Sequence, residues 1–445
     1  MKPQTPKDSS AVAGSSGASD PSDPFRSLLE SGIEKLLRNL TRRLLIVGDF
    51  GKDLDDEDTV LFLTGEQRHR RQTQLEFFNT AGSRKQDLFE LSAVIANLAP
   101  PVKRAQLAKG TLKLLGKPDV PVGIGTDCKN SPLGHDHEFA NVTYMADESE
   151  LEDGRELLVR TLENAEDKSI TLVLISGMTD IAVILKERSE LIQAKCESVA
   201  IMGGVEVEKG TNNVVIDKDG YMVPDSAANN KFDMESAVYT YRRLQELGIK
   251  LVILTRAAAY ACKVPRSFYD ELADTGHPVG IKLRDSQQGS IESLWQRACL
   301  PAGDEGRAKL PDRCNKDWFC DTFCGGQGKD RSGSDSIWDL IQSFNLYDPM
   351  TLIAAVPELR ERFYDPTVVK VGETEHLVIG VSDALPGVKD AAALAAYMLQ
   401  RCLLSLSASL EELPREFRNE KVTSEASQPP VPPPRDGAEV SGDAK

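Results

Sequence analysis

The chain alternates short, continuous apolar runs with longer amphipathic stretches. Runs of Val, Ile and Leu with little polar interruption are typical of strands that are buried on both faces, as in a parallel sheet. The stretches between them have helical spacing. The predicted strands are 44–47, 93–97, 120–123, 170–175, 198–202 and 250–254, and the predicted helices are 99–115, 152–166, 180–195 and 234–247. The predicted fold class is therefore α/β, an open and mostly parallel sheet with helices on both faces.

Both ends of the chain differ in composition from the middle. Residues 1–23 are rich in Ser, Ala, Gly, Asp and Pro, and the run PPVPPP lies within 411–445. Such segments bury too little apolar surface to fold, so we expect a disordered leader over 1–23 and a mostly disordered, Pro-rich tail over 411–445. One α/β domain is then expected over 24–410. The leader also fits a secretion signal that is not cleaved.

Composition narrows the classes of partner and location. The 445 residues carry a formal net charge of -16, and an acidic surface repels phosphate backbones, so nucleic acid is a disfavoured partner. No run of about 18 apolar residues occurs, so no membrane partner is expected. A cytoplasmic protein is predicted, and a homo-oligomer remains open.

The eight cysteines form no CxxC pair, which suits free thiols in a reducing compartment. Cys314, Cys320 and Cys324 are close in sequence. A zinc site there would need a fourth ligand, so we favour a loop with packed thiols.

Polar residues follow four of the predicted strands, where parallel sheets bind their ligands. They lie at 49–56, 176–180, 203–206 and 255–256, and Arg256 in the last group could meet a phosphate or form a surface salt bridge. The first group is unusual, because five aspartates and one glutamate lie between 49 and 58. Hard oxygen ligands in that number favour calcium or magnesium. The alternative is a solvated acidic loop in which Asp55 or Asp56 caps a helix.

Two other classes of acidic loop fit less well. The Gly and terminal Glu offsets of an EF-hand are absent, and a strand precedes the loop where an EF-hand has a helix. A haloacid-dehalogenase-like phosphatase would carry an Asp-x-Asp-x-Thr nucleophile motif, which this loop lacks.

The acidic segment resembles the aspartate fingerprint of the nucleoside hydrolases, Asp-x-Asp-x-Gly-x-Asp-Asp. Asp49 matches the first Asp, and Asp55 and Asp56 match the final pair. Gly51 replaces the second Asp, and Asp53 replaces the Gly. The resemblance implies that Asp56 binds Ca²⁺ and that Asp55 is the general base. Asp49 or Asp53 would then supply the ligand missing at position 51.

Four later segments resemble the same family: SGMTD at 176–180, MGG at 202–204, PDSAANN at 224–230 and NLYDP at 345–349. SGMTD at 176–180 implies that the Thr179 carbonyl binds calcium, and NLYDP at 345–349 implies that Asp348 is another ligand. Tyr347 replaces the family's His that assists the leaving base, and Tyr260 is a second candidate acid, although a phenol is a weaker acid than imidazolium. The resemblance implies a sugar site built from Met202, Asp219, Tyr221, Asp225, Asn229 and Asn230.

The order of these motifs over about 44–404 is similar to one branch of the family, the Q-class type III effectors (HopQ and XopQ) and their relatives. The resemblance implies calcium-dependent hydrolysis of the N-glycosidic bond of a ribonucleoside or a related N-riboside. The alternative is a protein that binds a ribosyl compound, such as an ADP-ribose-like ligand, with weak or no turnover. The resemblance implies that such a protein could be an effector that a type III system secretes into a host cell, where it acts through a protein partner.

Overall fold

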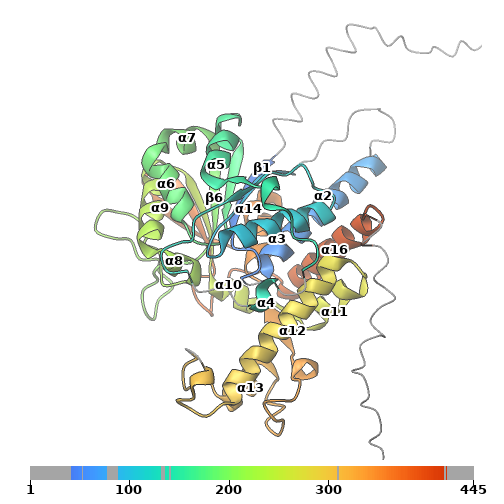
Figure 1. Cartoon of the computed structure of the whole chain (residues 1–445). Coiled ribbons are helices and arrows are strands. Elements are labelled where there is room, and N and C mark those ends of the chain that lie inside the picture. The colour runs from blue at the N-terminus through green and yellow to red at the C-terminus, as the bar shows by residue number, and fades with distance from the viewer. Residues whose placement is uncertain are drawn as a thin grey trace, which may run out of the picture.

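The computed structural model (Figure 1) has one large, mostly parallel sheet. It describes residues 42–52, 54–77, 89–131, 136–139, 142–307, 310–414 and 417, so the predicted leader and most of the predicted tail lie outside the described residues. The sheet has the order β10-β11-β7-β6-β5-β1-β2-β3-β4, and its pairs are parallel except β10 with β11. Its strands are β1 (Arg42–Gly48), β2 (Phe89–Ala96), β3 (Val122–Ile124), β4 (Glu152–Asp153), β5 (Ile170–Leu174), β6 (Cys196–Met202), β7 (Lys250–Leu254), β10 (Thr367–Val371) and β11 (Thr374–Ile379).

The predicted fold class is confirmed, and each of the six predicted strands overlaps an observed one. One predicted helix is wrong in extent. The stretch 180–195 forms two helices, α6 (Thr179–Glu187) and α7 (Ser189–Lys195). They are separated at Arg188, whose φ of -140° is incompatible with a continuous helix. The hairpin of β10 and β11 and the short strand β4 were not predicted.

Chain order reverses in the middle of the sheet. From β1 the chain runs outwards through β2, β3 and β4, and it then returns to place β5 on the other side of β1. Ligands of open α/β sheets bind at such a switch point, outside the carboxyl ends of the strands. The segments that follow β1 and β5 are therefore the expected walls of a site.

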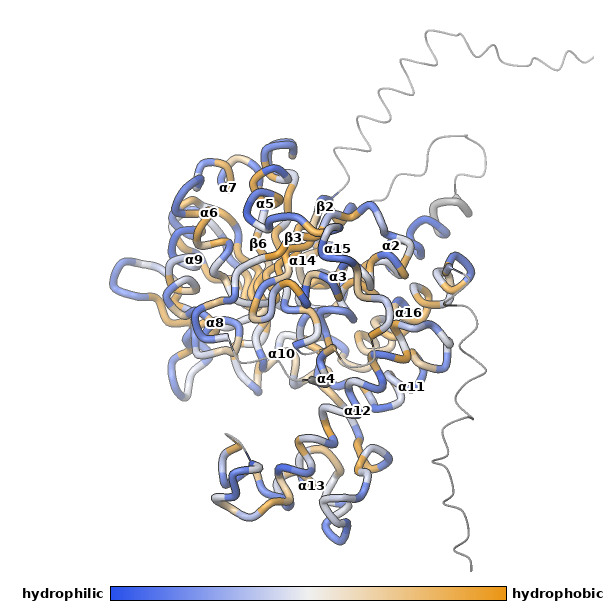
Figure 2. Tube along the Cα trace, in the orientation of Figure 1, coloured by the Kyte–Doolittle hydropathy of each residue, from blue (hydrophilic) through white to orange (hydrophobic). Residues whose placement is uncertain are grey.

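Helices cover both faces of the sheet, as Figure 1 shows. The residues that pack on one face come from α5 (Gly154–Glu163), α6, α7 and α9 (Met234–Glu246). Those on the other face come mainly from α2 (Asp55–Phe77), α3 (Pro101–Leu114), α14 (Asp348–Ala355) and α16 (Ala391–Leu410). The apolar colour in Figure 2 is concentrated where these helices meet the strands.

The remaining helices lie around this core. They are α4 (Asp136–Phe139), α8 (Ala228–Phe232), α10 (Arg256–Ala261), α11 (Ser267–Asp274), α12 (Pro278–Cys299), α13 (Lys316–Phe323) and α15 (Pro357–Phe363), with 3-10 turns at Glu148–Glu150, Glu305–Arg307 and Trp338–Leu340. A small two-stranded sheet joins β8 (Lys263–Pro265) to β9 (Ser343–Asn345).

Helix α16 is long and apolar enough to cross a membrane by length and composition alone. It packs along α2, where Ser405 hydrogen bonds to Thr64 and Arg401 to Glu66. Packing of this kind is what a core helix needs, so we assign α16 to the core.

Helix α13 is carried away from the sheet by α12 (Figure 1). Its aromatic side chains pack on Trp295 of α12, whose ring centroid lies 5.1 Å from that of Phe319. The cysteines of this region, Cys314, Cys320 and Cys324, are buried free thiols, as expected. Within the described ranges they take no part in a metal-binding group of three ligands.

Candidate functional site

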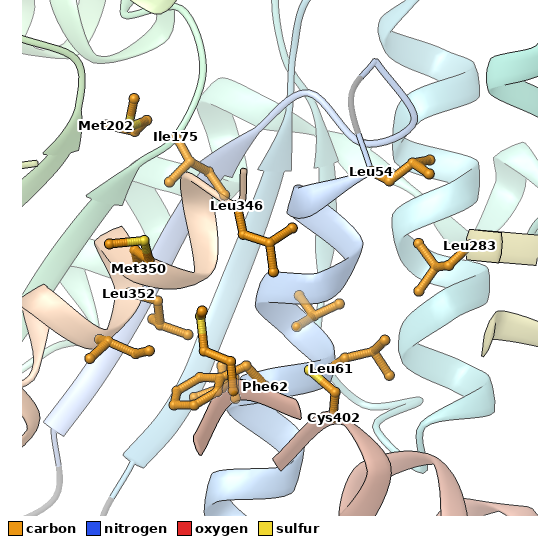
Figure 3. Close-up of a cluster of buried hydrophobic side chains, with 14 of the residues drawn as sticks. Leu54, Leu61, Phe62, Ile175, Met202, Leu283, Leu346, Met350, Leu352 and Cys402 are labelled. Atoms are coloured by element: carbon orange, nitrogen blue, oxygen red, sulfur yellow. The ribbon is translucent and has the colours of Figure 1, made fainter. Parts of the chain in front are cut away.

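Three carboxylates meet at the switch point of the sheet. Asp55 and Asp56 open α2 directly after the β1 loop, and Asp348 opens α14 almost three hundred positions later. One carboxylate oxygen from each lies within 4.8 Å of the others, and all three residues are buried. The sequence predicted this meeting. Figure 3 shows a cluster of buried apolar side chains in this region, among them Leu61 and Phe62 of α2 and Met350 and Leu352 of α14.

The carboxylate of Asp55 joins the two helices directly. Its Oδ2 accepts the backbone N–H of Tyr347 at 2.9 Å and that of Asp348 at 3.3 Å. Both N–H groups belong to the start of α14, where backbone donors lack partners within the helix. These bonds fix the orientation of Asp55 beside Asp348.

Asp56 is the most deeply buried of the three, with no exposed surface. Its Oδ1 accepts the backbone N–H of Asp49 at 2.9 Å, while its Oδ2 has no hydrogen-bond partner among the described residues. Burial, followed by the charges of Asp49 and Asp55, raises the pKa of Asp56 well above its ordinary value. A Cβ at Gly48 would lie only 2.4 Å from Asp56 Oδ1, so this approach requires glycine.

These observations fit a divalent cation. Buried carboxylates at this spacing repel one another unless a proton or a cation offsets their charge. The oxygen of Asp56 without a partner is the feature that a cation would satisfy, and the donor set consists of hard oxygens only. Asp49 adjoins Asp56 through its backbone and its charge, whereas Asp53 lies outside the described residues.

Gly51 stands where the fingerprint has its second Asp. Its φ is +85°, and a Cβ there would lie 3.0 Å from Leu107 Cδ2 and 3.2 Å from the Glu138 carbonyl oxygen. The loop therefore has a backbone conformation that an aspartate would adopt only under strain. Glycine at position 51 is therefore the residue that suits this loop conformation.

Some of the predicted sugar-site residues also lie at the carboxyl ends of the strands. Asn229 donates to the carbonyl of Ile175 at 3.0 Å and to that of Met202 at 3.1 Å, so it ties the end of β5 to the end of β6. Asn230 donates to the carbonyl of Asp225 at 3.1 Å. Their predicted contact with a ribose stays a prediction.

Other predicted residues have protein partners of their own. The hydroxyl of Thr179 donates to Asp233 at 2.9 Å, at the start of α6. Asp219 forms an exposed ion pair with Arg242 at 2.9 Å, and Tyr221 lies under the same guanidinium. These contacts account for Asp219 and Tyr221 without a sugar, and they do not connect either residue to the three carboxylates.

A cavity of about 310 Å³ opens beside Asp55. Tyr347 lines it, and its ring meets the exposed ring of Tyr260 edge-on at 6.3 Å. The other residues that line the cavity are Gly51, Lys52, Leu54, Tyr269, Ser286, Gln287, Ser290, Phe344, Asn345 and Leu346. The candidate base Asp55 and the candidate acid Tyr347 thus line the pocket, whereas the second candidate acid, Tyr260, does not line it and contacts the ring of Tyr347.

Sequence reasoning missed the polar side chains that brace these loops. Asn97 follows β2 and donates to Asp180 Oδ2 at 2.8 Å, while Asp180 also accepts the N–H of Thr126 at 3.0 Å. Arg104 of α3 is fully buried and bonds the carbonyls of Asp49 and Phe50. The signal for Asn97 was its place at the end of a predicted strand, whereas Arg104 lay in a predicted helix and gave none.

No family model matches the chain, and no curated protein matches it. The type III effector protein XopQ, solved in complex with adenosine diphosphate ribose, aligns at TM-score 0.67 with 30% identity, over 86% of this chain and 99% of that one.

Two further structures are also similar. The effector protein XOO4466 aligns at TM-score 0.65 with 29% identity, over 86% of this chain and 99% of its own. A purine-preferring ribonucleoside hydrolase from Gardnerella vaginalis aligns at TM-score 0.49 with 14% identity, over 81% of this chain and 99% of its own. The identity to XopQ over nearly its whole length, together with the order of the acidic motifs, decides the family. This chain belongs to the nucleoside-hydrolase-like superfamily, on the branch that contains XopQ.

Proposed function

We propose that this chain binds a ribosyl compound at the switch point of its sheet and hydrolyses the N-glycosidic bond of that compound. The observation that carries the proposal is the convergence of Asp55, Asp56 and Asp348 within 4.8 Å. A buried group of carboxylates beside a cavity is unfavourable for stability alone, so it indicates a binding role.

Asp56 and Asp348 would hold a divalent cation, with Asp49 as a further ligand, and calcium suits a set of oxygen donors. Such a cation supplies a binding point for ribose hydroxyls and lowers the pKa of a bound water. Asp55 is the proposed general base. Its carboxylate is held in one orientation by the N–H groups of Tyr347 and Asp348, and a base must be positioned before it can accept a proton.

The leaving base would enter the cavity beside Tyr347. Tyr347 and Tyr260 are the proposed proton donors, and a phenol is a weak acid at neutral pH. We therefore expect the fastest turnover for N-ribosides whose base is a stable leaving group. A cationic base, which departs as a neutral molecule without taking up a proton, is the extreme case.

Ligand binding with little turnover is the second candidate function. XopQ was solved with adenosine diphosphate ribose, and Tyr347 and Gly51 depart from the hydrolase fingerprint. Arg256 is exposed and lies one helical turn before Tyr260 on α10, a position suited to a phosphate of such a ligand. Under this candidate, the protein would be an effector delivered by type III secretion and would act through host partners.

Mass spectrometry of a riboside panel tests the proposal. The panel contains inosine, uridine, adenosine, nicotinamide riboside and ADP-ribose, each with calcium or with a chelator. Wild type is expected to release a free base from at least one compound only with calcium. Asp56→Asn and Asp348→Asn are expected to lower the rate at least a hundredfold, because each removes a charge that holds the cation.

The matched control is Asp390→Asn. Asp390 caps α16 with its side chain, and asparagine caps a helix equally well. This variant should keep the wild-type rate. Binding of ADP-ribose without release of any base would favour the second candidate, and calcium-independent release would overturn the proposed site.

A further inference from the structure

We propose that Arg104 is a positioning residue that holds the acidic loop in the geometry its carboxylates need. Arg104 touches neither the cavity residues nor the three carboxylates in any recorded contact, and it acts through the backbone of Asp49. The inference rests on the proposed function only for what the site binds. We call the set of hydrogen bonds from Arg104 to the two loops and to Glu138 the clamp. The clamp is a feature of the fold, and it is tested separately from the function.

The guanidinium of Arg104 is fully buried, and all three of its nitrogens donate to oxygens. Nη1 donates to the carbonyl of Asp49 at 3.1 Å and to that of Phe50 at 3.0 Å. Nε donates to the carbonyl of Leu98 at 3.1 Å, and Nη2 to that of Ala99 at 2.8 Å. One side chain therefore binds the loop after β1 and the loop after β2 at once.

The charge of Arg104 is compensated by a carboxylate on a third segment. Nη2 also donates to Glu138 Oε2 of α4 at 2.9 Å, and neither side chain of this pair has exposed surface. Because a buried charge without a partner is strongly unfavourable, the pair fixes α4 against the two loops. Only a guanidinium, with five N–H groups in a planar fork, can serve so many acceptors together.

The loop after β2 has a backbone that needs such support. Leu98 is buried and has a φ of +70°, in the left-handed region that residues other than glycine rarely adopt. Its N–H bonds the carbonyl of Thr126 at 2.8 Å, and its own carbonyl receives Arg104. Strain of this kind persists only where the surroundings determine the conformation, and it is typical of functional sites.

A short chain of bonds links Arg104 to the carboxylates. The carbonyl of Asp49 accepts from Arg104, and the N–H of Asp49 donates to Asp56 Oδ1 at 2.9 Å. Asp49 is therefore held from both sides, by the Arg104 guanidinium at its carbonyl and by the candidate metal ligand Asp56 at its N–H. Release of the carbonyl frees the loop to rotate, and the approach of Asp49 to Asp56 is then lost.

Arg104→Lys tests the clamp, because the lysine ammonium keeps the positive charge but lacks the planar guanidinium that donates to several carbonyls at once. Arg307 provides the matched control. It is also buried, and it donates to several carbonyls, among them those of Leu300 at 2.8 Å and Pro311 at 3.0 Å, in the region after α12. Arg307→Lys therefore removes a similar network outside the site. Both variants should lose thermal stability to a similar degree.

Two measurements test the clamp and the cation site independently: hydrogen exchange of the loop after β1, and the Kd for a bound cation. In cation-free buffer, hydrogen exchange of the amides of Asp49 and Lys52 should become at least tenfold faster in Arg104→Lys and stay unchanged in Arg307→Lys. With terbium as a luminescent probe of calcium sites, Arg104→Lys should raise the Kd at least tenfold, and Arg307→Lys should stay within twofold of wild type.

Each outcome has a defined consequence. Unchanged loop exchange in folded Arg104→Lys overturns the clamp, and faster exchange with an unchanged Kd overturns its role as a positioning residue. Faster exchange in a protein whose wild type binds no terbium supports the clamp and contradicts the cation of the proposed function. If Arg104→Lys does not fold, Glu138→Gln takes its place, with faster loop exchange expected and unchanged exchange overturning the clamp.

Discussion

At the scale of single residues, the acidic loop depends on two glycines as well as on its aspartates. Gly48 allows Asp56 Oδ1 to lie against the backbone, and Gly51 turns the chain with a φ of +85°. The sequence predicted the carboxylates because acidic residues after a strand stand out in the pattern. It could not predict the turn, because a glycine in a loop has many conformations and only the packing around it selects one.

Gly51→Ala should destabilise the protein by about 2 kcal/mol, since a left-handed conformation costs an L-residue about 1–2 kcal/mol and the new Cβ meets Leu107 and Glu138. Gly210→Ala is the matched control. Gly210 has a φ of +78° with nothing within 4 Å of its Cβ, so only the conformational term of about 1 kcal/mol applies. Urea unfolding measures both values. Equal losses in the two variants would show that Gly51 is not sterically confined.

The difference between a local sequence pattern and packing in the folded chain also explains why Asp348 was predicted and Arg104 was not. Asp348 lies in a short motif, and the motif carries its own signal. Arg104 lies in an ordinary amphipathic stretch, where an arginine is normally exposed to solvent. Its burial follows from two loops and the helix α4, which only the folded chain brings together, and no local sequence pattern indicates that arrangement.

At the scale of elements, α2 turns the acidic run into the start of a buried helix. Acidic side chains in a first turn are favourable, because they lie at the positive end of the helix dipole. Asp55 and Asp56 lie in the carboxylate cluster, while Glu57 forms a buried ion pair with Lys282 at 2.5 Å and Asp58 accepts from Tyr269 at 3.2 Å. The alternative of a solvated acidic loop is therefore wrong, because these four acidic residues are buried.

Helix α12 begins at a buried histidine, and this cap gives the protein a pH dependence. His277 Nδ1 accepts the N–H of Val279 at 3.2 Å, which requires an unprotonated nitrogen. Burial lowers the pKa of His277 to about 4. The unfolded chain binds this proton near pH 6.5, so the unfolded state is favoured as the pH falls from about 6.5 towards 4.

His277→Asn should therefore flatten the pH dependence of stability, because asparagine still caps the helix and does not titrate. The difference in pKa of about 2.5 units between the folded and unfolded states corresponds to about 3 kcal/mol, at 1.36 kcal/mol per unit. Urea unfolding at pH 5 and pH 7.5 should show a smaller loss for the variant than for wild type. His376, whose pKa burial also lowers to about 4, retains its own share of the loss. An unchanged slope would contradict the role assigned to His277.

At the scale of the whole molecule, the sequence predicted the half of the fold that is built from βα units. Strands buried on both faces give continuous apolar runs, whereas the amphipathic helices between them alternate apolar and polar residues with helical spacing. The two patterns are therefore easy to distinguish in the sequence. The last third of the chain lacks that contrast. All eight residues of α14 are buried, and a short helix that is apolar on every side has no amphipathic period to recognise. The motif therefore predicted Asp348, but the helix that carries it was not predicted.

Because Asp55 and Asp56 lie almost three hundred positions before Asp348, a cation bound between the three carboxylates should stabilise the entire domain. Without a cation, the raised pKa of Asp56 means that the folded state keeps a proton that the unfolded chain has lost, so this residue lowers stability as the pH rises above about 4. Calcium at a hundred times its Kd should add about 2.7 kcal/mol to the free energy of unfolding, through preferential binding to the folded state.

Asp348→Asn should lose most of that gain, whereas Asp390→Asn should keep it, since Asp390 only caps α16. Differential scanning calorimetry at pH 7.5, with calcium and with a chelator, measures the difference in Tm for each protein. A domain of this size should shift by a few degrees for each kcal/mol. Equal shifts in both variants would place the stabilising cation elsewhere. If calcium does not raise the Tm of wild type, then protons, and not a metal ion, offset the charge of Asp55, Asp56 and Asp348.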